Sequence, residues 1–324
     1  MKYPFKFLRF VTFASLVAVC LLSPFSDASA AEPPSYASAL GYTVNTFSSF
    51  AGQSIDLTNS GRSGFQWYPW NFFGSRAQTE KIVVNSDGSV TLNGDTTGPN
   101  GELATATPAN NSAKFTGTAF GGGAYIEASL MFDPATVAAA DSKGWPSFWA
   151  MSLEHVSTQS EQWKGKSQGY LHFIEVDFFE YDMLPSKLGQ NYYGATMHDW
   201  YGNYKQTCAP AALCRASRPI SEVRTMVPAN TDFRQYHRYG FLWVPATSTH
   251  PGYAQYYFDG NAVGPAINWT QYRDQPAIPD GQPWQYGVID KHHLVLILGT
   301  GLNEPMTIRS VNVWQSSSGQ NLHN

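Results

Sequence analysis

Short runs of β-branched and aromatic residues recur through most of this 324-residue chain, and glycine, proline or aspartate closes most of them. An apolar run at residues 82–84 is followed by an Asp87-Gly88 turn and then by Val90 and Leu92, which alternate with polar residues. This pattern is typical of a β-hairpin. Comparable strand patterns lie at residues 125–132, 241–244, 256–263, 293–298 and 307–314.

Helical patterns are scarce along the chain. Only residues 134–142, which are rich in alanine, have the composition of a helical turn or two. A parallel sheet needs helices between its strands, and no such alternation is present in the sequence. The sequence therefore predicts an all-β fold, a large antiparallel sandwich. Neither an internal repeat nor a low-complexity linker divides it, so we expect a single domain.

The first 30 residues are organised like a secretory signal peptide. Three basic residues precede an apolar run at 10–22, and Ala28-Ser29-Ala30 supplies a small-residue cleavage site. The apolar run is shorter than the roughly 20 residues that a transmembrane helix needs to cross a bilayer. We expect cleavage after Ala30 and a mature protein that is secreted, into the extracellular medium or the periplasm, without a membrane partner.

Two cysteines follow the leader, Cys208 and Cys214. In an oxidising compartment such a Cys-x5-Cys pair is expected to form a disulfide that closes one short loop. Two free thiols remain the alternative. A zinc site is not expected, because neither a second cysteine pair nor a suitably spaced histidine pair accompanies these residues.

Charge excludes several classes of partner. The chain has 20 Lys and Arg residues against 24 Asp and Glu residues, a formal net charge of -4, and only 14% of its residues are charged. No basic excess is available to neutralise a phosphate backbone, and no polybasic stretch could hold the chain to an anionic membrane. We therefore expect no nucleic-acid partner, and we expect a monomer.

The acids of segment 171–182 are the main candidates for chemistry. Side chains alternate between the two faces of a strand, so Glu175 and Asp177 share one face while the apolar residues beside them point into the core. The next acid, Glu180, comes one position later than this alternation allows. A β-bulge that inserts one residue would bring it into line. The sequence thus predicts three carboxyl groups in a row on one strand face.

Such a row of acids is energetically unfavourable, because neighbouring carboxylates repel one another and at least one of them acquires a raised pKa. Glycoside hydrolysis exploits this situation, since it needs one protonated and one ionised carboxyl group. One alternative is a solvated outer strand that happens to be acidic. Another is a calcium site, although no EF-hand-like spacing of ligands accompanies the acids.

The segment Glu175-Val176-Asp177-Phe178-Phe179-Glu180 resembles the bulged form of a motif, Glu-x-Asp-x-x-Glu, found in family 16 glycoside hydrolases. This family includes the laminarinases, agarases and carrageenases. Further segments resemble the family in the same order along the chain: Gly123–Ala128, Gly144–Trp149, His237–Trp243 and Tyr257–Gly260. The resemblance extends over Tyr42–Gln315. The expected parts are a signal peptide, a lead-in, a catalytic domain and a tail, at residues 1–30, 31–41, 42–316 and 317–324.

This resemblance implies a β-jelly-roll sandwich of the concanavalin A-like lectin and glucanase type. It also implies retaining hydrolysis by double displacement. By position in the family's motif, Glu175 would be the nucleophile and Glu180 the general acid/base. Asp177 would be the carboxyl group that tunes the nucleophile.

Aromatic residues supply the second half of a carbohydrate site, because sugar rings stack their apolar faces on indole and phenol rings. The candidates are Trp145, Trp149, Trp163, Trp200, Tyr192 and Tyr193. Trp149 belongs to a segment that resembles the family's cleft wall, and Trp200 follows His198 in a stretch that resembles the strand after the catalytic one. We expect Trp145, Trp149, His198 and Trp200 to bind substrate. A place in the core is the alternative for each aromatic residue, and a structural role is the alternative for His198.

One departure from the family concerns calcium. Members commonly end in a strand whose aspartate helps to bind a structural calcium ion, and Arg309 occupies that place in this chain. We therefore expect neither a metal ligand nor a cofactor, with a structural calcium ion as the weaker alternative.

These features predict a secreted retaining endo-glycoside hydrolase that cleaves a β-linked polysaccharide. A β-1,3-glucan is the first expected substrate and a galactan the second, and the negative net charge favours a neutral polymer over a sulfated one. The alternatives are a non-catalytic, lectin-like sandwich that only binds glycans and a transglycosylase of the same fold, in which a sugar hydroxyl replaces water.

Overall fold

The computed structural model describes most of the chain that follows the predicted signal peptide. The described residues are 32–48, 54–70, 79–93, 101–109, 115–139, 144–158, 170–181, 193–203, 215–223, 227–270, 287–299 and 305–324. All of them belong to one compact unit, Ala31–Asn324. The predicted signal peptide and the predicted disulfide between Cys208 and Cys214 lie outside the described residues.

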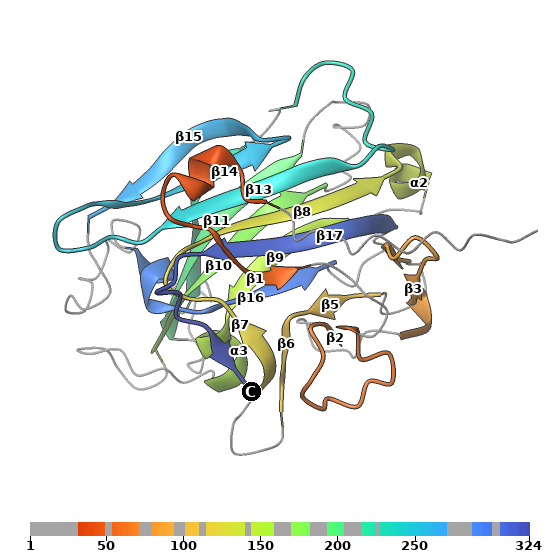
Figure 1. Ribbon diagram of the computed structural model, residues 1–324, viewed down its shortest axis with the longest axis horizontal. Coiled ribbons are helices and arrows are strands. Elements are labelled where there is room, and N and C mark those ends of the chain that lie inside the picture. Colours follow the sequence, from red (N-terminus) through yellow and green to blue (C-terminus); the bar gives the residue numbers. More distant parts are fainter. Residues whose placement is uncertain are drawn as a thin grey trace, which may run out of the picture. The chain divides into compact units, whose positions relative to one another are not determined.

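Two antiparallel sheets form the body of this unit (Figure 1). In order across the first sheet lie β15 (Asn261–Trp269), β14 (Gly252–Phe258), β13 (His237–Val244), β8 (Ala124–Phe132), β17 (Met306–Gln315), β4 (Val90–Leu92) and β3 (Ile82–Val84), and β1 (Val44–Ser48) also pairs with β17. In order across the second lie β12 (Arg215–Val223), β11 (Gly194–Asn203), β10 (Tyr170–Glu180), β9 (Ser147–Ser152), β16 (Leu294–Leu298), β5 (Leu103–Ala104) and β2 (Tyr68–Pro69).

The chain passes repeatedly between these two sheets. After β8 in the first sheet it forms β9 to β12 in the second, returns for β13 to β15, and then adds β16 to the second sheet and β17 to the first. The predicted all-β antiparallel jelly-roll sandwich is thus confirmed. The predicted hairpin is present as well, because β3 pairs with β4 across a turn in which Gly88 adopts a φ of 82°, a conformation that glycine reaches without strain.

Aromatic side chains from both sheets fill the space between them. Phe178 of β10 lies against Phe241 of β13, with ring centroids 5.1 Å apart, and the ring of Phe179 lies 4.3 Å from that of Tyr239. Trp243 is fully buried in the same cluster. Large aromatic side chains dominate core energetics because each removes roughly 150–250 Å² from water. This core therefore fixes β10 against the first sheet.

Among the described residues, three short α-helices accompany the sheets: α1 (Ser35–Ser38), α2 (Pro134–Ala139) and α3 (Leu153–Thr158). Only α2 corresponds to the helical segment expected from the sequence. In α1, within the expected lead-in, Tyr36 stacks on Tyr257 with centroids 4.2 Å apart, and its hydroxyl donates to that of Tyr125. The lead-in is therefore docked on the first sheet. No helix in the described part of the chain is long and apolar enough to cross a membrane.

A small third sheet contains β18 (Leu322–His323), β7 (Phe115–Ala119) and β6 (Ala106–Pro108), so part of the expected C-terminal tail is a paired strand. This sheet and α3 pack on the side of the second sheet that faces away from the core. A second hydrophobic cluster lies there, containing Trp149, Phe173, Ala106, Ala119 and Leu153. We call this side of the second sheet the site face.

Candidate active site

The predicted β-bulge is present in β10. Between Asp177 and Phe179 the strand advances by two residues while its partner β9 advances by one, so Phe178 is the inserted residue. The pairing of β10 with β11 shifts over the same stretch, between Asp177 and Glu180. The bulge lies between the second and third acids, where the break in alternation predicted it.

The bulge brings the three acids into line. Phe178 and Phe179 are consecutive, yet both belong to the core between the two sheets. Glu180 therefore returns to the site face, where Asp177 interacts electrostatically with both Glu175 and Glu180. The structure thus places the three carboxyl groups together.

An indole group holds the carboxyl group of Glu175. Trp200 Nε1 donates to Glu175 Oε2 at 2.5 Å. Trp200 stands diagonally across from Glu175 because Phe173 pairs with Trp200, and Glu175 with His198. Burial is the main reason that the pKa of Glu175 rises to about 7; the bond from Trp200 lowers this pKa, and repulsion from Glu180 adds to the rise.

Asp177 is the most buried of the three acids, with 2% of its surface exposed. Burial, the charges of Glu180 and Glu175, and a hydrogen bond with Glu180 all raise the pKa of Asp177 well above its ordinary value. The ring of His198 contributes Nε2 at 3.3 Å from Asp177 Oδ2. Burial and the two neighbouring carboxyl groups favour the protonated form of Asp177, which can donate a hydrogen bond to an ionised neighbour.

A second indole group holds Glu180. Trp145 Nε1 donates to Glu180 Oε1 at 2.9 Å, from the segment directly before β9. Glu180 pairs with Ser147, the first residue of β9, which explains why Trp145 is within reach. The glutamates at the two ends of the row are thus partly exposed and each accepts an indole N–H, whereas the aspartate between them is buried.

Three of the four predicted substrate-binding residues contact the acids themselves. Trp145 and Trp200 donate to the two glutamates, and His198 lies beside Asp177. All three side chains are partly exposed. Their polar atoms therefore act on the acids, while their rings remain available to a ligand.

The other aromatic candidates are placed differently. Trp149 lies on the site face but is only 3% exposed, and its Nε1 donates to the carbonyl of Gly299 at 2.8 Å. Tyr193 is buried in the core between the sheets, which is the alternative that the sequence left open for each aromatic candidate. Trp163 and Tyr192 lie outside the described residues.

Two aromatic residues that the sequence analysis did not single out also border the site face. Trp70 and Phe115 are partly buried and pack against the same hydrophobic cluster as Trp200. The aromatic-rich segment 67–70 was the available signal for Trp70. This signal did not show on which face Trp70 lies. Trp70 directly follows the two-residue strand β2, and the face it takes depends on how β2 pairs with β5.

The described residues offer no arrangement for a metal ion. No cluster of three or more His, Cys, Asp or Glu side chains among them is placed to hold one. Arg309 lies over the ring of Tyr236, with its guanidinium carbon 3.8 Å from the ring centroid.

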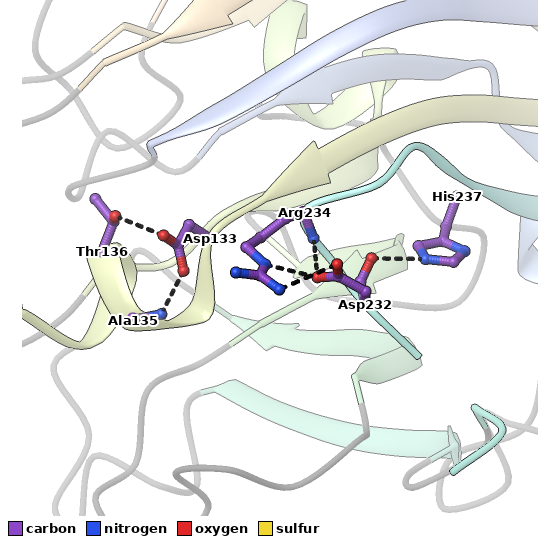
Figure 2. Close-up of polar contacts among 6 residues, drawn as sticks. All are labelled: Asp133, Ala135, Thr136, Asp232, Arg234 and His237. Atoms are coloured by element: carbon purple, nitrogen blue, oxygen red, sulfur yellow. Dashed lines mark hydrogen bonds and ion pairs between the residues drawn. The ribbon is translucent and has the colours of Figure 1, made fainter. Parts of the chain in front are cut away.

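A pocket of about 400 Å³ lies beside α2, and the acids do not line it. Asp133 and Arg234 contribute its charges. Both side chains already have partners, as Figure 2 shows: Asp133 accepts hydrogen bonds from Ala135 N and Thr136 Oγ1, and Arg234 forms an ion pair with Asp232. No carboxyl groups are crowded together there, so the site face is the better candidate for chemistry.

Comparison with known proteins finds similarity at the level of fold. No family model matches the chain, and a search of curated proteins finds no match. Among solved structures, endo-1,3-β-glucanase from Streptomyces sioyaensis is 20% identical, over 87% of this chain and 97% of that chain, with a TM-score of 0.47. A 1,3-α-1,4-β-D-galactose-4-sulfate-3,6-anhydro-D-galactose 4 galactohydrolase is 12% identical, over 83% and 95%, with a TM-score of 0.46. Basic winged bean lectin is 11% identical, over 79% and 94%, with a TM-score of 0.34. The similar structures therefore include both hydrolases and a lectin.

Proposed function

We propose that this protein is a secreted retaining endo-glycoside hydrolase that cleaves a β-linked polysaccharide. The observation that carries the proposal is the bulge in β10, which lines up Glu175, Asp177 and Glu180 on one face. Glycan binding alone does not require a row of crowded, largely buried acids, whose desolvation and mutual repulsion destabilise the fold. The row therefore favours catalysis over a purely lectin-like role.

The residues divide the chemistry between them. Glu175, as the carboxylate, attacks the anomeric carbon while Glu180 donates a proton to the departing oxygen. Glu180 then acts as a base and activates the water that releases the sugar with net retention. Protonated Asp177 donates a hydrogen bond within the row and so reduces the negative charge beside the nucleophile.

A β-1,3-glucan is the first proposed substrate and a galactan the second. The net charge of -4 suits a neutral polymer, because a sulfated one would be attracted by basic subsites. The partly exposed rings of Trp145 and Trp200 lie beside the acids and offer surfaces on which sugar rings can stack. The leader-like residues 1–30 support access to an extracellular polymer.

A reducing-sugar assay of the purified protein against laminarin, lichenan, agarose, carrageenan, xyloglucan and chitin tests this function. We expect release from laminarin, as oligosaccharides of mixed length, and ¹H NMR of the first products should show the β anomer. Glu175→Gln is the control and should release no sugar while it still binds the polymer. Binding without release by the unaltered protein would favour a lectin, and products longer than the substrate would indicate transglycosylation.

A further inference from the structure

Trp200 connects the row of acids to an ordered stack of rings. Its Nε1 donates to Glu175 Oε2 at 2.5 Å. Its indole lies nearly parallel to the ring of Phe173, with centroids 6.2 Å apart and planes 11° apart. The ring of His155 lies on that of Phe173, with centroids 3.6 Å apart and planes 9° apart. Three rings from β11, β10 and α3 therefore stack in nearly parallel planes.

The outer end of this stack is itself held in place. Glu154, beside His155 in α3, accepts from the backbone N–H of His293 at 3.1 Å and lies 2.6 Å from its ring Nδ1. The N–H of Leu153 donates to the carbonyl of His293 at 2.7 Å. Burial, aided by the charge of His292, lowers the pKa of His155 to about 4, so the ring that stacks on Phe173 is neutral at neutral pH.

We propose that Trp200 is a positioning residue for Glu175, and that the rings of Phe173 and His155 keep its indole in the plane that directs the N–H at the carboxyl group. The catalytic meaning of this inference rests on the proposed function, but the contact itself can be measured without turnover. Trp200 thereby has a role beyond that of a surface on which a sugar ring stacks.

An N–H bond to a carboxylate favours the ionised form. Because two or three such bonds take a carboxyl group about two units below its ordinary pKa, loss of one should raise the pKa of Glu175 by roughly one unit. Among the residues that the structure describes, the other titratable groups that face Glu175 are Asp177 and Glu180 on its own strand and His198 opposite it in β11. β9 presents the uncharged Met151 opposite Glu175. None of these groups changes in a Trp200 variant.

Trp200→Phe tests the inference, because it keeps an aromatic ring and removes the N–H. In ¹³C-carboxyl-labelled protein, with the Glu175 signal assigned by its loss in Glu175→Gln, NMR titration should show a pKa raised by roughly one unit. The acid limb of the pH profile of kcat/KM should shift to higher pH by the same amount. Trp149→Phe is the matched control, because that N–H is bonded to the Gly299 carbonyl and its loss should leave the titration of Glu175 unchanged.

His155→Leu tests the ring stack without altering the N–H donor. The pKa of Glu175 should rise in the same direction but by less, while near-ultraviolet circular dichroism stays native. An unchanged titration of Glu175 in Trp200→Phe overturns the positioning role of Trp200. An unchanged titration in His155→Leu overturns the claim that the ring stack holds the indole in place. If no polysaccharide is cleaved, the proposed function fails, yet the titration still decides this inference.

Discussion

Replacement of Glu175 by glycine should lower polysaccharide turnover by roughly 10⁴-fold or more, and added azide should restore part of it. Glycine leaves a space where the carboxylate of the proposed nucleophile stood, and the small azide anion can enter that space. Azide then attacks the anomeric carbon from the side of the missing carboxylate in a single displacement. The product should therefore be the α-glycosyl azide, which ¹H NMR identifies.

Glu180→Gly should give the opposite anomer. This variant keeps the proposed nucleophile, so an activated substrate such as a dinitrophenyl glycoside, whose leaving group needs no proton, should still form the glycosyl-enzyme. Azide then replaces water in the second displacement and yields the β-glycosyl azide. The pair of products assigns nucleophile and acid/base to the two glutamates independently of rate.

Glu127→Gln is the matched control for both variants. Glu127 is also a buried acid, 7% exposed, and accepts the hydroxyl of Tyr125 at 2.7 Å, but it lies on β8 in the first sheet. Its replacement should leave turnover near normal. Normal turnover in Glu175→Gly, or a β-azide from that variant, would contradict the proposed nucleophile.

The bulge in β10 could be predicted because the sequence around it is otherwise regular. Apolar residues alternate strictly with Glu175 and Asp177, and the delay of Glu180 by one position breaks that alternation at a single place. Only one inserted residue restores three acids to one face. A local pattern was sufficient because faces of a strand are set by local geometry.

The roles of the tryptophans could not be predicted in the same way. Trp145 lies 35 residues from Glu180 in the chain, and Trp200 lies 25 residues from Glu175. Their contacts depend on the register of β9 and β11 against β10 and on the direction of each indole, and neither is encoded in local sequence. The sequence therefore indicated aromatic residues near the acids without indicating which atoms they present.

The ends of the chain show a similar limit. The lead-in at 31–41 is rich in small residues and proline, so its own propensity for structure is low. Its order comes from Tyr36, which stacks on Tyr257 far along the chain. β18 likewise exists because Leu322 and His323 pair with β7. Tertiary contacts stabilise both segments, which explains why local composition did not reveal them.

Glu175→Gln should stabilise the folded protein above neutral pH while it abolishes catalysis. Burial and the charge of Glu180 make the ionised form of Glu175 unfavourable in the fold, and glutamine keeps the shape and the acceptor for Trp200 Nε1 without the charge. A pKa that rises from 4.5 to about 7 corresponds to up to roughly 3 kcal/mol. Active sites often sacrifice stability in this way.

The pH dependence of this stability gain follows from the difference between the pKa of Glu175 in the unfolded and in the folded protein. Below the unfolded-state pKa near 4.5, Glu175 is neutral in both states and its burial carries no charge penalty; as pH rises through the folded-state value of about 7, the fold loses that advantage. Calorimetry should therefore show equal midpoints for the two proteins at about pH 4 and a gain of roughly 5–10 °C for Glu175→Gln at about pH 8. Glu80→Gln, which removes an exposed carboxylate, should show no such pH-dependent gain. Equal shifts at both pH values would mean that packing, and not the charge of Glu175, sets the effect.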